Sequence, residues 1–358
     1  KLGVSRAPIS RNVRGCWNLG YCGLGCPTNA KQSMLVTTIP AALDRGATLV
    51  SRLRALRFVA ARDRVVAVLC APLRANGVDV APWTVTVRAR AFVAAGGAIN
   101  TPALLMRSDL PDPRALLGKR TFLHPTVVSA ALMPERIDAF AGAPQSVYSD
   151  AWLERAAPAG AIGYKLEAPP VHPILAAITL PDFGDAHAAR MAQLAHWHVL
   201  IALLRDGFGA ASQGGIVRLR DAGSPELDYP LTPYLWDGVR RAMVSMAELQ
   251  FAAGARAVMP VHARGIAFHD VAAARDAIAR FDFAPRTTPV VSAHVMGGAP
   301  FGSDPATSVV DEDGRHHHVA NLHVMDASLF PTSIGANPQL TIYAIVARLA
   351  DRLARTLV

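Results

Sequence analysis

The chain has 358 residues, about the length of two ordinary domains, and 51% of its residues are hydrophobic against 18% charged. These values exclude a disordered tail and a small disulfide-stabilised scaffold. The formal net charge is +9, but the arginines are scattered singly and only 6% of residues are aromatic. With no helix-turn-helix or zinc-finger spacing, we expect no nucleic-acid partner.

The first part of the chain, residues 1–118, predicts a mixed α/β domain. Apolar spacing predicts a helix over 33–47, and β-rich runs predict strands over 47–51, 55–60, 65–70, 83–88 and 91–95. The last strand ends at Gly96 and Gly97, and a helix is expected over 102–108. A strand, a glycine turn and a helix in this order are typical of nucleotide-binding folds.

After residue 118 the sequence changes to long irregular stretches rich in proline and histidine. This change predicts a second domain over 119–290 and a return segment of the first domain over 291–358. Helices are expected over 186–204 and 235–253, and a strand over 215–220. The return segment predicts a strand over 322–324 and a closing helix from about Pro338. No segment reaches the ~20 apolar residues of a membrane-spanning helix.

The amino-terminal end has no signal peptide and no initiator Met, because the chain opens with Lys1 and a polar run that contains arginine. The sequence therefore favours a cytoplasmic location without deciding the compartment. We expect a processed or truncated chain.

The return segment carries three motifs in a fixed order: residues 292–298 (SAHVMGG), 321–331 (NLHVMDASLFP) and 334–342 (IGANPQLTI). They resemble the carboxyl-terminal signature of the glucose-methanol-choline family of flavin-dependent alcohol oxidoreductases, and look closest to its cholesterol-oxidase and long-chain-alcohol-oxidase branches. The resemblance implies an α/β fold in which a split, Rossmann-like FAD-binding domain carries an inserted α+β substrate domain on an antiparallel sheet.

A second match is residues 97–108 (GAINTPALLMRS), followed by Leu123, His124 and Pro125. The turn after this motif departs from the family, since residues 109–111 (DLP) stand where the pattern has Gly, a hydrophobic residue and Gly. The family's opening strand–GxGxxG–helix unit is also missing from this sequence. By resemblance, the FAD-binding domain is incomplete at its N-terminus, and the lost segment or a complementary chain is the expected partner.

Three residues are predicted to be catalytic. Oxidation of an alcohol requires a group that takes the hydroxyl proton, and His294 matches the family's catalytic histidine, although a lone histidine is often a core residue. Asn337 matches the second catalytic position, or else belongs to an Asn-Pro turn that starts a helix. Glu167 resembles the acidic residue that some sterol oxidases place at the substrate, with a solvated strand carboxylate as the alternative. His124 is expected to be an exposed loop residue.

The predicted flavin-binding residues follow from the same resemblance. Asp326 resembles the residue that bonds the ribityl chain, with a plain turn aspartate as the alternative. The helix that begins near Pro338 offers its N-terminus to an anionic reduced flavin. The complete predicted set is Gly97, Ala98, Thr101, Pro102, Asp326, Ala327, Asn337, Pro338 and Gln339.

The spacing of Cys16, Cys22 and Cys26 resembles the three-iron cluster loop of bacterial flavin sugar dehydrogenases in this family, and predicts a possible [3Fe-4S] cluster. Free thiols, or one disulfide with a spare cysteine, are the alternatives. Three successive histidines, residues 316–318, are expected at the surface, because neighbouring residues of a hairpin point in alternating directions.

Together these features predict FAD-dependent oxidation of an alcohol, with proton removal and hydride transfer to flavin. The apolar middle domain predicts an apolar long-chain or sterol-like alcohol as the substrate. The alternative is an iron–sulfur electron-transfer or accessory subunit, with flavin chemistry elsewhere. Because the GxGxxG unit is absent, this chain alone is expected to be inactive.

Overall fold

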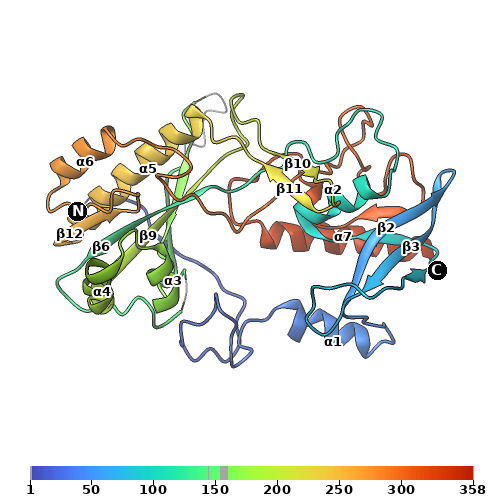
Figure 1. Ribbon diagram of the computed structural model, residues 1–358, viewed down its shortest axis with the longest axis horizontal. Helices are drawn as coiled ribbons and strands as arrows, with labels where there is room; N and C mark the ends of the chain where they lie inside the picture. The colour runs from blue at the N-terminus through green and yellow to red at the C-terminus, as the bar shows by residue number, and fades with distance from the viewer. Residues whose placement is uncertain (1, 144, 154–159, 358) are drawn as a thin grey trace. The chain divides into compact units, whose positions relative to one another are not determined.

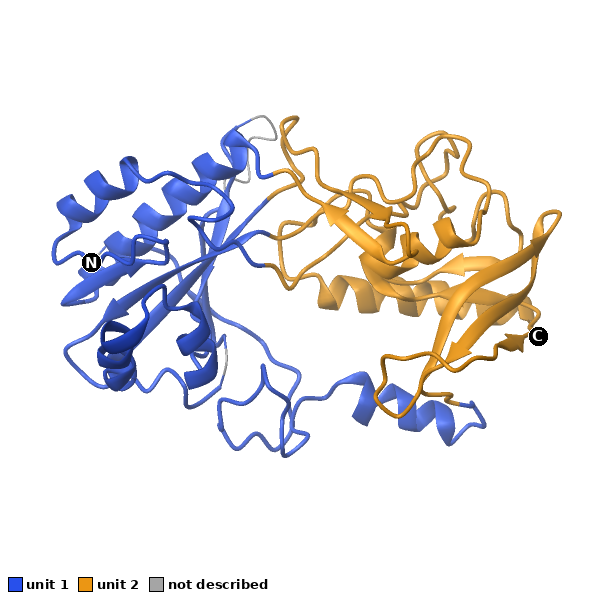
Figure 2. Cartoon of the chain, viewed as in Figure 1, with its two compact units in different colours: residues 1–48, 125–205, 231–291 blue, residues 49–124, 206–230, 292–358 orange. Residues whose placement is uncertain are grey.

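The computed structural model describes residues 2–143, 145–153 and 160–357. The chain divides into two compact units, each assembled from three segments (Figure 2). Unit 1 contains Lys1–Thr48, Pro125–Arg205 and Leu231–Val291, and unit 2 contains Leu49–His124, Asp206–Pro230 and Ser292–Val358. This division differs from the sequence-derived one in three places: the first 48 residues cluster with the middle of the chain, Asp206–Pro230 clusters with its ends, and the boundary expected after residue 118 lies after His124.

Unit 1 is built on a six-stranded sheet in which every pairing is antiparallel (Figure 1), as expected for the inserted domain. In spatial order the strands are β1 (Ala7–Pro8), β7 (Val147–Trp152), β8 (Tyr164–Glu167), β9 (Trp197–Leu204), β6 (Thr126–Leu132) and β12 (Ala257–Pro260). Alternate residues of each strand point to opposite faces, so the two faces carry different side chains.

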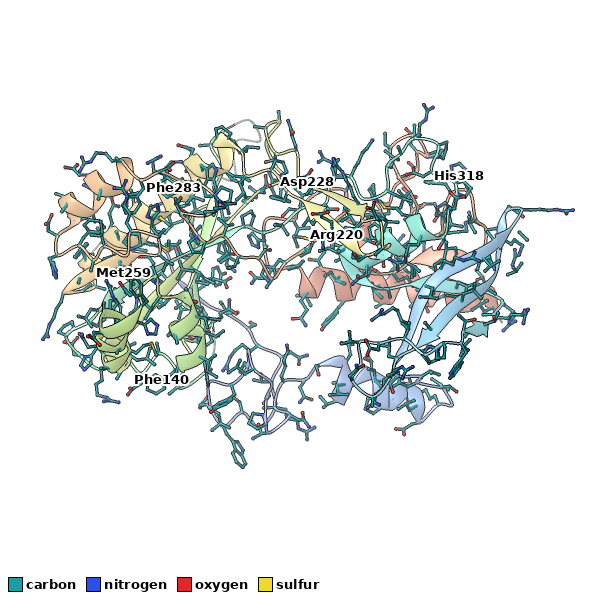
Figure 3. All side chains as sticks on the ribbon, in the orientation of Figure 1. Phe140, Arg220, Asp228, Met259, Phe283 and His318 are labelled. Atoms are coloured by element: carbon teal, nitrogen blue, oxygen red, sulfur yellow. The ribbon has the colours of Figure 1, made fainter. Side chains whose placement is uncertain are left out.

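Helices cover both faces of this sheet. On one face lies α5 (Pro233–Ala252), where Ser129 Oγ donates to Gln250 Oε1 over 2.7 Å, and α6 (Val271–Ala279) packs on α5. The opposite face carries α3 (Pro173–Thr179) and α4 (Gly184–Ala192), where Leu180 packs on Ala130 and Trp197. Phe283, labelled in Figure 3, stacks on Trp236 of α5 with ring centroids 6.2 Å apart, which ties the segment after α6 to that helix.

The helix predicted over 186–204 is wrong in its second half. α4 ends at Ala192, a short η2 (Leu194–His196) follows, and the run Trp197–Leu204 is strand β9. A continuous apolar run fits a buried strand as well as a buried helix. Residues 197–204 form a strand because they pair with β6 on one side and with β8 on the other.

The predicted helix over 33–47 is shorter than expected. It is replaced by η1 (Met34–Val36) and α1 (Thr38–Leu43), because Pro40 has no N–H to donate to an earlier turn. Residues 47–51, predicted as a strand, form none.

Unit 2 contains three small sheets. β2 (Leu53–Ala61), β3 (Arg64–Pro72) and β4 (Val85–Val87) form an antiparallel sheet, and β10 (Ile216–Leu219) pairs with β11 (Pro225–Asp228). β5 (Phe92–Ala94) and β13 (Leu322–Val324) pair in parallel, which brings together the two ends of the predicted split domain.

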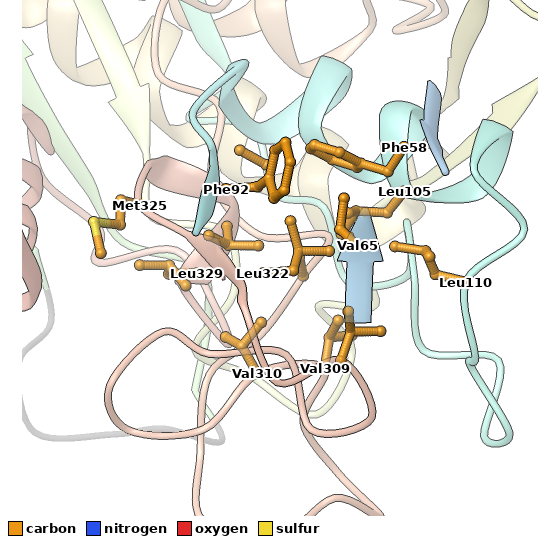
Figure 4. Packing of buried hydrophobic residues seen from close by; sticks show 14 of the residues in the cluster. Phe58, Val65, Phe92, Leu105, Leu110, Val309, Val310, Leu322, Met325 and Leu329 are labelled. Atoms are coloured by element: carbon orange, nitrogen blue, oxygen red, sulfur yellow. The ribbon is translucent and has the colours of Figure 1, made fainter. Parts of the chain in front are cut away.

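Two helices complete unit 2, α2 (Gly97–Arg107) and α7 (Gln339–Leu357), together with the short η3 (Ala327–Leu329). The unit's hydrophobic core gathers the parallel strand pair, α2 and the β2–β3 hairpin (Figure 4). Phe58, Leu105 and Leu322 are among its buried residues. Among the described residues, no helix has the length and apolar character that crossing a bilayer requires.

Candidate functional site

The motif loop of residues 292–298 depends on two glycines with a left-handed backbone. Gly297 has φ +87° and Gly298 has φ +100°. A Cβ on Gly297 would lie 2.2 Å from the Arg120 carbonyl oxygen, and one on Gly298 would lie 2.8 Å from Pro102 Cγ. Only glycine allows both the conformation and this close approach, so the loop is seated against the first turns of α2.

His294 of this loop forms a pair with His124. The Nδ1 atoms of His124 and His294 are 3.0 Å apart, which requires that one of them carries the proton and the other accepts it. Ser292 positions both residues, because its Oγ accepts the backbone N–H of His124 over 3.2 Å and that of His294 over 3.3 Å. This contact occupies Nδ1 of His294, and Nε2 is the second nitrogen of the same ring.

The expectation that His124 is an exposed loop residue is wrong. Its exposed fraction is 0%, whereas His294 is half-buried. Burial follows from the backbone on either side: Phe122 pairs with Met296, and this bridge draws residues 122–124 against the motif loop. His124 is therefore a buried partner of the predicted catalytic residue His294, which the sequence alone did not indicate.

Asp326 holds three motifs of unit 2 together. Its Oδ2 accepts from the Gly97 backbone N–H over 2.8 Å and from Thr101 Oγ1 over 2.5 Å. Its Oδ1 accepts from the backbone N–H and the hydroxyl of Ser328 over 2.7 and 2.6 Å. A carboxylate has about four acceptor positions, and protein donors occupy all four. Next to it, the Ala327 carbonyl accepts the Gly297 N–H over 2.9 Å, so η3 also fixes the histidine loop. Flavin binding by Asp326 stays a prediction.

Asn337 lies where the sequence places it, directly before Pro338 and the start of α7 at Gln339. Asn337 and Gln339 are exposed and Pro338 is buried. The approach of Asn337 to His294 that catalysis requires stays a prediction.

The N-terminus of α7 fits an anionic group of a cofactor such as FAD, whereas the N-terminus of α2 already faces the carboxylate of Asp326, which accepts the Gly97 N–H. Neither helix has an acidic residue in its own first turn, so no carboxylate within α7 offsets the positive end of that helix. A Cβ at Gly97 would meet nothing within 4 Å, so the backbone at the start of α2 borders open space. Ala98, Thr101 and Pro102, in the same predicted set, are buried and shape this turn.

Glu167 belongs to unit 1 and is not the solvated carboxylate that the alternative interpretation expects. Its exposed fraction is 1%. Lys165 Nζ lies 2.9 Å from its Oε1, and Gln145 Nε2 donates to Oε2 over 2.9 Å. The Lys165 ammonium also lies 4.2 Å from the ring centroid of Tyr148. The carboxylate is thus buried in a polar cluster of the sheet, and a catalytic role for it stays a prediction.

The expected iron–sulfur cluster is not supported. Across residues 2–143, 145–153 and 160–357, no group of three or more His, Cys, Asp or Glu side chains is arranged to hold a metal ion. Cys16, Cys22 and Cys26 are free thiols. Two of them are engaged locally, since Cys16 Sγ accepts the Asn18 N–H over 3.4 Å and Cys26 Sγ accepts the Ala30 N–H over 3.2 Å.

The thiols of this loop differ in acidity. Hydrogen bonds from Thr28 and from backbone N–H groups stabilise the Cys26 thiolate and lower its pKa to about 7. Burial, followed by the neighbouring Cys16 and Cys26, raises the pKa of Cys22.

The histidine run at 316–318 is only partly at the surface. His318 is exposed, but His316 is buried at 2% exposure, which corrects the sequence-based expectation. Burial, together with the neighbouring His318 and His317, lowers the pKa of His316 to about 4. His316 is therefore neutral at physiological pH and belongs to the packing of unit 2.

A second buried pair escaped sequence analysis. Tyr229 donates a short hydrogen bond to Asp206, and Asp206 is 2% exposed. Burial and then the Asp206 carboxylate raise the pKa of Tyr229. Two charged residues, Arg205 and Asp206, follow the apolar run Trp197–Leu204, and this is a signal that could have drawn attention to Asp206.

Two family models match the chain, and both describe a GMC oxidoreductase: an N-terminal model over residues 1–126 and a C-terminal model over residues 211–346. A GMC-type oxidoreductase of Sinorhizobium fredii is 30% identical over 98% of this chain and 66% of its own length. The long-chain-alcohol oxidase FAO4A of Arabidopsis thaliana is 26% identical over 96% of this chain and 48% of its own length. The chain thus spans between about half and two thirds of the relatives that it matches.

Among solved structures, pyridoxine 4-oxidase from "Mesorbium loti" superposes with a TM-score of 0.68 at 19% identity, covering 98% of this chain and 65% of that one. At this identity the likeness concerns the fold, and it agrees with the mixed α/β architecture described above.

Proposed function

The chain belongs to the GMC oxidoreductase family, and we propose on this basis that it takes part in the FAD-dependent oxidation of an alcohol. The observation that carries the proposal is the His124–His294 pair, with 3.0 Å between the Nδ1 atoms and with His294 on a loop fixed against α2 and η3. When bound, FAD supplies the acceptor for the hydride of the carbinol carbon. The residues of this chain then have to bind the alcohol and move its hydroxyl proton.

The pair suits proton removal because each ring has two nitrogens with different tasks. His294 takes the hydroxyl proton at Nε2, and its Nδ1 proton stays in the 3.0 Å hydrogen bond to Nδ1 of His124, which holds the ring in place. The positive charge thereby stays on the half-buried ring, where water can solvate it. Asn337 holds the same substrate oxygen through its amide, and the N-terminus of α7 favours negative charge beside it.

The substrate is proposed to be an apolar alcohol. Support comes from the long-chain-alcohol oxidases among the relatives, at 22–26% identity, and from the apolar faces of the unit 1 sheet. The accessory-subunit alternative requires a metal cluster, for which the described side chains offer no site.

The cofactor is proposed to depend on a further segment. Its α2 and α7 contacts lie in this chain, whereas a GxGxxG loop for the pyrophosphate does not occur in the sequence. We propose that the loop is supplied by an additional N-terminal segment or by a complementary chain.

The test is anaerobic flavin reduction by an alcohol in the flavin-loaded enzyme completed with the proposed GxGxxG segment, since the 358-residue chain alone is expected to bind FAD weakly. His294→Ala should lower the reduction rate by roughly 10²–10⁴-fold with flavin content unchanged. His318→Ala, at an exposed histidine of the same unit, is the matched control and should reduce its flavin at the normal rate. Equal rates in the two variants would remove the basis for the proposal.

A further inference from the structure

Unit 1 contains an apolar cavity that no part of the proposed proton path uses. It has a volume of about 240 Å³ and lies on the sheet face opposite α5, between β6, β9 and α3. Val128, Val199, Ile201 and Trp197 line it from the sheet, and Ala176 lines it from α3. All lining side chains are apolar except that of Thr179.

Strand register places one charged residue, Glu167 of β8, beside the apolar wall of the cavity. Ile201 is the Cα partner of Val128 on β6 and of Glu167 on β8. Residues directly opposite on paired strands share a face, so Glu167 lies on the same face as the cavity. Its carboxylate is buried and forms an ion pair with Lys165, whose Nζ lies 2.9 Å from Oε1. The negative charge is thus neutralised within the sheet. The cavity therefore offers apolar contact and one hydroxyl.

We propose that this cavity binds the unbranched alkyl chain of an aliphatic alcohol. The inference rests on the proposed function and narrows its substrate class. A volume of 240 Å³ equals that of about eight water molecules at ~30 Å³ each. A methylene group is close to water in size, so the cavity accommodates about eight carbons of a linear chain. The fused-ring nucleus of a sterol, with 17 ring carbons, is too large for it.

α3 provides both a way to block the cavity and a control. Ala176 is buried and faces the cavity, whereas Ile178, two residues on, is 75% exposed and does not line it. Phenylalanine at position 176 places a ring in the cavity, and the same residue at position 178 places it in solvent. The two variants thus differ only in where an aromatic ring is added to one short helix.

The experiment measures binding of linear 1-alkanols of four to twelve carbons to the full chain without flavin. Trp197 lines the cavity, so its fluorescence reports occupancy, and Trp197→Phe identifies its contribution among the five tryptophans. The Kd should fall about fourfold per added methylene, the equivalent of ~0.8 kcal/mol, and level off near eight carbons. Ala176→Phe should weaken octanol binding at least tenfold, and Ile178→Phe should leave it unchanged.

The outcomes separate this inference from the proposed function, because no turnover is involved. A Kd that does not depend on chain length, or a sterol that binds as tightly as octanol, would overturn the inference even in an active enzyme. Chain-length-dependent binding in a protein whose flavin is never reduced by alcohols would leave the cavity in place and refute the function. The wild-type chain-length series decides the matter if Ala176→Phe does not fold.

Discussion

Replacing Asp326 tests whether one carboxylate joins the motifs of unit 2. In Asp326→Asn, one oxygen becomes an NH₂ group, and each oxygen currently faces a backbone N–H, that of Gly97 or that of Ser328. Because the asparagine can turn its single oxygen to only one side, its NH₂ group must face an N–H donor on the other side. Asp326→Ala removes both acceptors.

The expected loss in the free energy of unfolding follows from the four hydrogen bonds that Asp326 accepts. Thr101 and Ser328 are fully buried, and an unsatisfied buried donor costs about 1–3 kcal/mol. Asp326 itself is half-buried, so water can replace part of each lost bond and the lower end of that range applies. The free energy of unfolding of unit 2 should fall by about 4 kcal/mol in Asp326→Ala and about 2 kcal/mol in Asp326→Asn. For a unit of this size, these losses lower Tm by roughly 12 and 6 °C.

Urea unfolding followed by circular dichroism gives the free energies, and hydrogen exchange localises the effect. Amides at the start of α2 should exchange faster in Asp326→Asn, while those of the unit 1 sheet should not. Asp221→Asn, at an exposed carboxylate of unit 2, is the control and should unfold like the wild type. If Asp326→Asn stays within about 0.5 kcal/mol of the wild type, the four contacts do not stabilise the unit and the reasoning fails.

Three further predictions concern thiol reactivity, pH and the cofactor. Iodoacetamide should label Cys26 faster than Cys22 at pH 7.5, with a rate that rises to half its maximum near pH 7, and equal rates would contradict the hydrogen-bonded thiolate. The folded-state pKa of His316 lies below its ordinary 6.5, so its contribution to stability is complete above pH 6.5 and is lost as pH falls towards 4. Between pH 7 and pH 4, protonation of His316 should therefore lower the free energy of unfolding of the wild type by about 3 kcal/mol. Denaturation of His316→Gln at the same two pH values should lack this contribution. Finally, the purified 358-residue chain should bind FAD weakly, because its sequence has no GxGxxG loop, and a stoichiometric flavin spectrum would refute this.

Elements with a strong local signal could be predicted from the sequence. The strand at Leu322–Val324, the hairpin β2–β3 and the long helix α5 lie where periodicity and turn residues place them. The errors fall where tertiary pairing decides between two structures that the residues allow equally, as in Trp197–Leu204.

The turn after α2 shows how a departure from a family motif can preserve the backbone. The family pattern has glycine where this chain has Asp109, and Asp109 adopts φ +50°, in the left-handed region that glycine favours. Aspartate tolerates this conformation better than most residues, because its short polar side chain can bond locally. The same backbone requirement is therefore met by a different residue type.

Sequence motifs located the parts of the site that depend on backbone geometry, and missed the parts that depend on burial. Gly297, Gly298 and Asp326 are fixed by close approach, positive φ and capping, and each of these leaves a residue-type signature in the sequence. His124 carries no such signature. Its role arises because a backbone bridge between Phe122 and Met296 brings residues 170 positions apart into hydrogen-bonding contact. A histidine before a proline has the same local sequence whether it is exposed or buried, so only the long-range pairing places His124 within hydrogen-bonding distance of the predicted base His294.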